Sequence, residues 1–138
     1  MPTKDYLLTN LDMDVVLGKG LARDWCSIWQ WQIPIGTEII LPPDVRLLMS
    51  LKDSTSADQF HKICYVRIEH YKVNRRSREL IYGPVSYRML KINSPFLHLA
   101  KSYYIYPKEW LVISVLSDNI IDVSASCFDL HVLRFQKD

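Results

Sequence analysis

The chain has 138 residues and a mass of 16.2 kDa; 49% of its residues are hydrophobic and 23% are charged. This length corresponds to one domain that folds without a metal or a disulfide framework, and the hydrophobic content excludes intrinsic disorder. No apolar run approaches the roughly 20 residues that a membrane-spanning helix needs. We therefore expect a soluble globular domain.

The net charge of +2 is unevenly distributed along the chain. Residues 62–91 contain eight basic and two acidic residues, a net charge of +6, whereas residues 1–61 carry −3 and residues 92–138 carry −1. A total charge this small does not by itself predict nucleic-acid binding. The segregation instead indicates contact between surfaces of opposite charge.

Residues 1–24 are interpreted as an N-terminal arm and residues 25–138 as the folded domain. In the arm, apolar residues from Leu7 to Val16 recur at near-helical spacing, but Gly18 and Gly20 interrupt any continuation. The arm could hold one short helix or strand.

From Trp25 onward, short runs rich in Ile, Val, Tyr and Trp alternate with clusters of Pro, Asp, Asn and Ser. This rhythm is typical of β-strands. The predicted strands are Cys26–Ile33, Thr37–Leu41, Val45–Leu51, Lys62–Val73, Glu79–Tyr82, Val85–Ile92, Tyr103–Tyr106, Trp110–Ser117, Ile120–Ser124 and Cys127–Phe135.

Patterns within the strands predict how they are arranged. Val66 and Ile68 alternate with Arg67 and Glu69, as in a sheet with one solvent-facing side, while Trp110–Ser117 is apolar on both faces and suits a central strand. We predict an all-β fold: a two-sheet antiparallel β-sandwich of jelly-roll or Greek-key type, with little helix.

The connections between strands are also predicted. Gly83-Pro84 should separate two strands, Asp118-Asn119 should form a two-residue hairpin, and 74–78 should form the tip of a long hairpin.

Motifs for enzymatic chemistry are absent from the sequence. It has no G-x-G-x-x-G, no phosphate-binding G-x-x-x-x-G-K-[ST], no G-x-S-x-G and no H-E-x-x-H. The pairs His61/Cys64 and Cys127/His131 have spacings that a strand does not bring to one metal or to one thiolate–imidazole contact. We therefore predict no enzyme, no cofactor and no metal site.

The three cysteines, Cys26, Cys64 and Cys127, lie far apart in apolar stretches. An odd number of such cysteines indicates reduced thiols in the core, and the N-terminus has no secretion-signal pattern. Both features favour a protein of a virion or of the cell interior.

Three arginines, Arg75, Arg76 and Arg78, lie at the predicted hairpin tip between Tyr71 and Tyr82. Guanidinium groups bind carboxylates and phosphates in a planar geometry. The alternatives are a solvated charge cluster, a charge-mediated contact with another protein subunit, and a nucleic-acid contact.

Three tryptophans, Trp25, Trp29 and Trp31, should lie on one face of the strand that begins this domain, because strand side chains alternate. They could be core residues, the centre of a subunit interface, or a platform on which sugar rings stack.

The pattern as a whole resembles the small single-sandwich structural proteins of viruses and phages, of the capsid, decoration or penton type. The resemblance rests on the Trp25–Ile33 strand, the Ile33–Glu38 entry to the next strand, Gly83-Pro84-Val85 and the closing Ile121–Leu130 segment. It implies a non-enzymatic capsid subunit that associates with copies of itself or with other structural subunits. A carbohydrate-binding β-sandwich is the alternative.

Overall fold

The computed structural model of the chain describes residues 3–9, 16–51, 62–74, 77–88, 96–98, 101–122 and 126–136. The strands in these residues are β1 (Thr3–Thr9), β2 (Val16–Leu17), β3 (Lys19–Gly20), β4 (Trp25–Gln32), β5 (Thr37–Leu41), β6 (Asp44–Leu51), β7 (Ile63–Tyr71), β8 (Arg78–Ser86), β9 (Phe96–His98), β10 (Tyr103–Ile105), β11 (Trp110–Ser117), β12 (Ile121–Asp122) and β13 (Ser126–Gln136).

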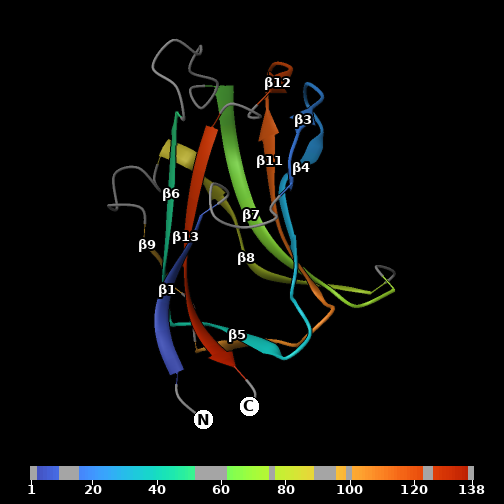
Figure 1. Cartoon of the computed structure of the whole chain (residues 1–138). Helices are drawn as coiled ribbons and strands as arrows, with labels where there is room; N and C mark the ends of the chain where they lie inside the picture. Colours follow the sequence, from blue (N-terminus) through green and yellow to red (C-terminus); the bar gives the residue numbers. More distant parts are fainter. Residues whose placement is uncertain are drawn as a thin grey trace.

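The strands form two antiparallel sheets that face each other (Figure 1). The first, called the β11 sheet, has the order β2-β4-β11-β7-β8. The second, called the β13 sheet, has the order β10-β5-β13-β6-β9, and β1 also pairs with β13. The predicted all-β antiparallel sandwich is confirmed.

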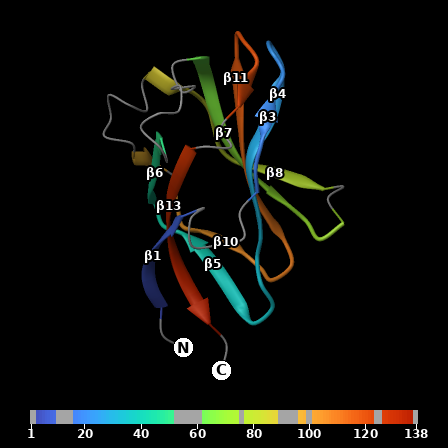
Figure 2. The same ribbon diagram turned by 45° about the horizontal axis from the view of Figure 1, so that its top comes forward.

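The two ends of the sandwich differ. At one end β3 and β12 form a separate two-stranded ribbon, called the tip below, and at the other end β5 and β10 lie across the base (Figures 1 and 2). The β7–β8 hairpin projects from the side of the molecule in both views.

Strand β11 is the centre of its sheet, as its two apolar faces predicted. It lies between β4 and β7, and residues 111–115 are all buried. A strand with neighbours on both edges and side chains on both faces has no water contact along most of its length, so apolar residues are favoured at every position.

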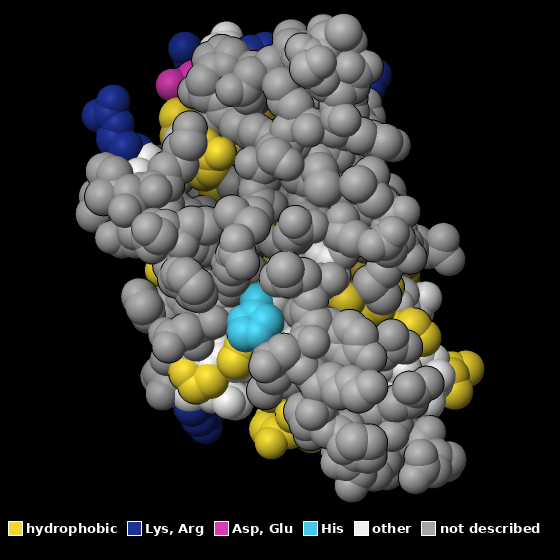
Figure 3. All heavy atoms as spheres, turned by 60° about the vertical axis from the view of Figure 1, so that its left-hand side comes forward, with side chains coloured by type: hydrophobic (Ala, Val, Ile, Leu, Met, Phe, Trp, Pro, Cys, Tyr) yellow, Lys and Arg dark blue, Asp and Glu magenta, His cyan; other side chains and the backbone are white. Residues whose placement is uncertain are grey.

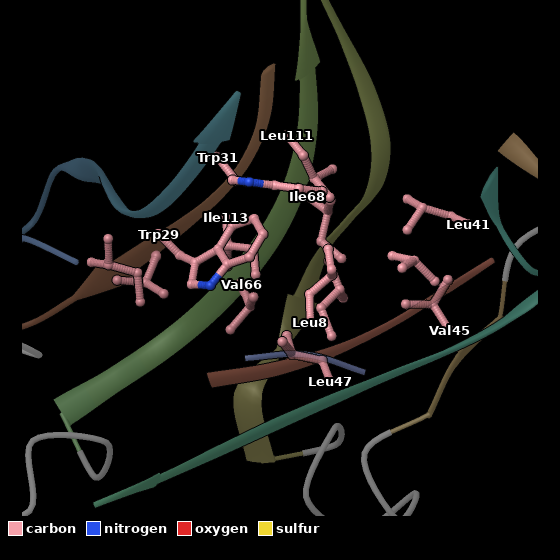
Figure 4. Packing of buried hydrophobic residues seen from close by; sticks show 14 of the residues in the cluster. Leu8, Trp29, Trp31, Leu41, Val45, Leu47, Val66, Ile68, Leu111 and Ile113 are labelled. Atoms are coloured by element: carbon pink, nitrogen blue, oxygen red, sulfur yellow. The ribbon is translucent and has the colours of Figure 1, made fainter. Parts of the chain in front are cut away.

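The core lies between the sheets. Figure 4 shows the Trp29 and Trp31 rings beside Ile113, Val66 and Ile68 of the β11 sheet, facing apolar residues of the β13 sheet. Fully burying one such side chain contributes about 1.5–3 kcal/mol, so this cluster supplies most of the driving force for folding.

The described part of the first 24 residues is built into the sandwich. Strand β1 pairs with β13 from Thr3↔Phe135 to Thr9↔Asp129, and its Leu8 lies in the core. Together with β2 and β3 this segment holds three strands, more than the one short element expected. The division of the chain after residue 24 stays a prediction.

Gly83-Pro84 does not end a strand, so the prediction of two separate strands there is wrong. β8 continues through it, with Tyr82 opposite Ile68 and Val85 opposite Val66. Gly83 has φ +95°, and a Cβ at this position would lie 2.6 Å from the Val66 carbonyl oxygen. Only glycine fits this irregularity, which lets pairing resume on its far side.

Asp118-Asn119 does not form the predicted two-residue hairpin either. After this turn, Ile121 pairs with Gly20 of β3, and not with β11. Strand β9 was not predicted, and residues 89–92 of the strand predicted to end at Ile92 lie outside the described residues.

Candidate interaction surface

The side of the β11 sheet that faces away from the core is called the outer face. Alternation along β11 places Val112, Ser114 and Leu116 there, opposite the core residues Leu111, Ile113 and Val115. The pairing registers add residues of β4 and β7 to the same face, namely Trp25, Ser27, Gln30, Tyr65, Arg67, Glu69 and Tyr71.

A β-bulge in β4 decides which tryptophans reach this face. Ile113 lies opposite Trp29 and Ser114 opposite Ser27, so Ile28 is an extra residue without a partner in β11. Both Ile28 and Trp29 then point to the core, and Trp25 is turned to the other side. The prediction that the three tryptophans share one face is therefore wrong.

The structure places the three tryptophans in two environments. Trp29 is 0% and Trp31 is 3% exposed, which corresponds to the core alternative, whereas Trp25 is half-buried on the outer face. The prediction of an interface or ligand platform therefore depends on Trp25 alone among the three.

Glu69 is the centre of a polar network on the outer face. Its Oε1 accepts hydrogen bonds from Arg67 Nε at 3.0 Å and from Ser114 Oγ at 3.2 Å, and its Oε2 lies 3.3 Å from Arg78 Nη1. The carboxylate is almost fully buried, at 3% exposure, beneath these side chains. Two cations and a hydroxyl compensate the cost of removing its charge from water.

Arg67 also holds Trp25 in place. Its guanidinium carbon lies 4.2 Å from the centre of the Trp25 ring, the geometry of a cation–π contact. A guanidinium that lies between a carboxylate and an indole is fixed in position, so Arg67 joins Trp25 to the Glu69 network.

Apolar side chains surround this network on the surface. Tyr65 is 46% exposed, and the half-buried Leu116 and Trp25 lie in register beside it. Leu80, which lies opposite Glu69, is 52% exposed. Trp, Tyr and Arg are the residue types enriched at the centres of protein interfaces, whereas a solvated sheet face is usually polar. The outer face has the composition of an interaction surface.

Of the three predicted arginines, the structure describes Arg78; Arg75 and Arg76 lie outside the described residues. Lys72 and Ser77 close the hairpin through a 2.9 Å backbone hydrogen bond, which confirms the predicted hairpin. A hydrogen bond with Tyr71 and the charge of Glu69 raise the pKa of Arg78. Arg78 is therefore a member of the Glu69 network.

A second polar cluster lies on the inner side of the same sheet, at the base. His70 Nδ1 is 3.0 Å from the Tyr103 hydroxyl, and its Nε2 is 2.9 Å from Glu109 Oε1. Tyr103 in turn donates a hydrogen bond to Glu79. It joins β7 to β10 and therefore links the two sheets.

The cluster shifts the titration of its acidic members. Burial raises the pKa of Glu109, but hydrogen bonds from the Tyr106 backbone N–H and from His70 outweigh it and hold the pKa below its usual range. Burial and the neighbouring Glu79 raise the pKa of Tyr103. Such shifts occur at catalytic sites, but also in structural networks.

The described thiols have no catalytic environment. Cys26 Sγ accepts a hydrogen bond from the Leu21 N–H at 3.0 Å, and Cys64 donates to Asp118 Oδ2 at 3.5 Å. Burial and the Asp118 carboxylate raise the pKa of Cys64, which disfavours the reactive thiolate. The side chains of His61 and Cys127 lie outside the described residues.

The described part of the chain contains neither a metal-ligand cluster nor a membrane-spanning helix. No three His, Cys, Asp or Glu side chains in this part of the chain are grouped as metal ligands would be. In the same residues there is no helix with the length and apolar content needed to cross a membrane.

The β13 sheet forms the opposite side of the molecule. Figure 3 views the side of the β13 sheet, where most of the visible surface belongs to residues that the structure does not describe.

Sequence reasoning missed the partners of Trp25. The alternation in β7 already separated Arg67 and Glu69 from the core, but no pattern indicated that Arg67 would cover Trp25, 42 positions earlier in the sequence. That proximity depends on the register of β4, β11 and β7.

Comparison with known proteins was made for sequence and for structure. No model of a protein family matches the sequence, and neither does any curated protein. A solved structure of the VP16-VP17 complex, a complex of the two major capsid proteins of bacteriophage P23-77, is similar with a TM-score of 0.71 at 8% identity, over 99% of this chain and 100% of that chain.

A second similar structure is VP17, a capsid protein of bacteriophage P23-77, with a TM-score of 0.67 at 7% identity. It is matched over 97% of this chain and 96% of that chain. At such low identity the likeness establishes the fold. The chain therefore has the fold of these phage capsid proteins, and the predicted resemblance to such proteins is confirmed at the level of the fold.

Proposed function

We propose that the chain is a non-enzymatic structural subunit of a viral capsid, which associates with copies of itself or with other structural subunits. The observation that carries this proposal is the likeness to phage capsid proteins along the whole length of both chains. Fold alone does not imply function, so the surfaces of this chain have to support the proposal independently.

The outer face provides that support. A subunit of a shell needs at least one surface that excludes water when a neighbour binds. Trp25, Tyr65 and Leu80 offer apolar contact area, and Arg67 and Arg78 offer charged donors at its centre. This combination fits a subunit contact better than a solvated surface.

The buried clusters favour a structural role over an enzymatic one. His70 is 2% and Glu109 is 7% exposed, so a substrate could not reach this histidine–carboxylate pair without opening the sandwich. A catalytic base has to contact its substrate directly or through one water molecule. We infer that this cluster stabilises the fold. The likeness to phage capsid proteins leads us to propose, separately, that the protein acts in the virion.

The carbohydrate-binding alternative has less support from the described residues. A sugar ring stacks on the flat face of an exposed aromatic ring, but Trp29 and Trp31 are buried and Arg67 covers one face of Trp25. Tyr65 is exposed, but a single ring does not form the aromatic row that this hypothesis predicts.

The proposal is tested by assembly of the purified full-length protein. We expect light scattering to show concentration-dependent oligomers and negative-stain electron microscopy to show regular particles or sheets. A strict monomer at every concentration, combined with the absence of the protein from purified virions that encode it, would contradict the proposed function.

A further inference from the structure

We infer that the β3–β12 tip binds the tip of a second copy of this chain, with the two copies related by a two-fold axis. This inference rests on the proposed function and specifies one of the contacts between subunits. The surface concerned consists of the ribbon and its two adjoining turns, residues 19–24 and 118–122, and is called the tip surface.

The tip surface carries an exposed aliphatic pair at the end of the sandwich. Figure 2 shows the turn after β3, in blue, and the turn before β12, in orange, side by side at the top of the molecule. Ile121 pairs with Gly20, so the next residues outward, Ile120 and Leu21, are cross-strand neighbours. Their side chains are 64% and 66% exposed, and a contact with another molecule would remove this apolar area from water.

The charges around the aliphatic pair balance. Lys62 lies at the tip surface, because its Nζ donates to the Ile120 carbonyl at 3.4 Å. With it, the surface has three basic and three acidic residues, namely Lys19, Arg23 and Lys62 against Asp24, Asp118 and Asp122. A surface without net charge does not repel its own copy.

Most of these charges already have a contact within one copy. Lys19 lies 3.5 Å from Asp122, and Asp118 accepts a hydrogen bond from Cys64 Sγ at 3.5 Å. These contacts hold the ribbon and its turns together. The charges that remain for a partner are therefore those of the turn that follows β3.

Arg23 and Asp24 are the charges available for a partner. Both are exposed, no described side chain forms an ion pair with either, and Asp24 Oδ1 accepts the Trp25 backbone N–H at 3.1 Å. They are consecutive and opposite in sign, so a two-fold axis beside them sets Arg23 of each copy against Asp24 of the other. Two reciprocal ion pairs then flank the aliphatic side chains, which makes the tip surface complementary to itself.

Two other surfaces with exposed apolar residues lack this balance. On the outer face, Arg67 and Arg78 surround a single carboxylate, Glu69. At the base, the turns that join β4 to β5 and β10 to β11 expose Lys108 and bury their one acidic residue, Glu109. Two copies of either surface would bring cations together without matching carboxylates, so of these three surfaces the tip surface fits its own copy best.

A two-fold contact has a consequence for assembly. It is closed, because it joins two copies and leaves neither tip free. Growth of a shell then needs at least one further contact, for which the outer face is available. The tip surface is small, so its contact is weak in isolation and depends on repetition in the assembly.

The test reverses one charge at a time. Arg23→Glu makes the two charges of the turn acidic, and Asp24→Lys makes both of them basic. The matched control is Lys108→Glu at the base, because Lys108 is also an exposed cation with positive φ, 68° against 60° for Arg23.

We expect each reversal to weaken the association of that variant with itself at least about tenfold, because like charges then meet across the axis. Lys108→Glu should associate like the wild type. Sedimentation velocity over a series of high protein concentrations measures these affinities.

The decisive step is to mix the two charge variants. The acidic turn of the Arg23→Glu protein complements the basic turn of the Asp24→Lys protein. A labelled Arg23→Glu protein should therefore bind the unlabelled Asp24→Lys protein at least about tenfold more tightly than it binds its own unlabelled form.

Three results would overturn the inference. If Arg23→Glu associates with itself like the wild type, or if the mixture binds no more tightly than each variant alone, the tips do not meet, although the proposed function stands because the wild type still assembles. A wild type that is monomeric at every concentration overturns both. Thermal unfolding verifies that each variant is folded; Lys19→Glu and Asp118→Lys replace an acidic or a basic variant that is not.

Discussion

Glu69 and His70 are consecutive residues of β7 and are equally buried, at 3% and 2% exposure, but they serve opposite sides of the sheet. Glu69 points outward and holds Arg67 and Arg78 on the surface. His70 points inward and connects β7 to Tyr103 of β10 and to Glu109. Of these two neighbouring residues, Glu69 thus organises the surface and His70 stabilises the fold.

The difference shows how the position of a buried polar group determines its role. The partners of Glu69 lie within its own sheet, so its loss alters a surface without separating the two layers. His70 contacts Tyr103, which lies in the other sheet, so its loss removes a link across the sandwich. The following predictions test this comparison.

The largest effect is expected from His70→Ala. Glu109 would stay buried without the imidazole, and removing one partner of a buried polar pair costs about 3 kcal/mol. Urea unfolding followed by tryptophan fluorescence measures this loss. His131→Ala, a half-buried histidine of β13, is the control and should cost less; equal losses would contradict a specific link between the sheets.

A smaller effect is expected from Glu69→Gln. The amide keeps an oxygen for Ser114 but loses the charge between two arginines, one of which is well exposed, so solvent screening limits the loss in stability to about 1–2 kcal/mol. Unfolding at low and at high salt measures it. Because Glu69 organises a surface, we expect Glu69→Gln to weaken assembly more than stability. If stability falls more than assembly, Glu69 stabilises the fold as His70 does.

A still smaller change in unfolding free energy, confined to acidic pH, is expected from replacing Glu109. Its pKa is lower when folded, so its stabilisation is complete above the ordinary carboxyl pKa and is lost as the pH falls through the folded value. Glu109→Gln should therefore flatten the acid limb of a plot of unfolding free energy against pH. An unchanged acid limb would mean that other carboxylates dominate.

The dependence of stability on alkaline pH tests Tyr103, another member of the same cluster. The pKa of Tyr103 is raised in the folded state, so its stabilisation is complete below the ordinary tyrosine pKa and is lost at higher pH. Tyr103→Phe should reduce that alkaline loss while leaving the outer face unaffected. Thermal unfolding across the alkaline range measures this difference.

The smallest effect is expected from Arg67→Lys. An ammonium keeps the charge beside Glu69, but it stacks less well on the Trp25 ring and loses the planar fork, at a cost of about 0.5–1 kcal/mol. A change in Trp25 fluorescence should accompany it. Trp25→Phe should cause a loss of similar size, and the double variant should cost less than the sum if the two side chains act together.

The fold could be predicted to a large extent because periodicity acts locally. Thr37–Leu41 has the predicted bounds, and Trp110–Ser117 has both the predicted bounds and the predicted central place, since an apolar run on both faces fits only a covered strand. Gly83-Pro84 misled the prediction because residue type indicates a break, whereas the partner strand allows an irregularity inside a continuous strand.

The candidate surface could be predicted only in part. Arg78 and Trp25 were identified as unusual residues, but the extra residue at Ile28, which turns Trp25 away from Trp29, depends on how β4 pairs with β11. The tip was missed because β3 and β12 are short and lie about 100 residues apart, so no local signal connects them.

Residue patterns along the chain were enough to predict the class of the fold and the basic character of the central segment, because alternation, turn residues and charge counts are properties of neighbouring residues. Which side chains meet follows from the pairing of the strands in three dimensions. Strand register placed Arg67 over Trp25 and His70 beside Glu109, and register depends on hydrogen bonds between strands that are far apart in the chain.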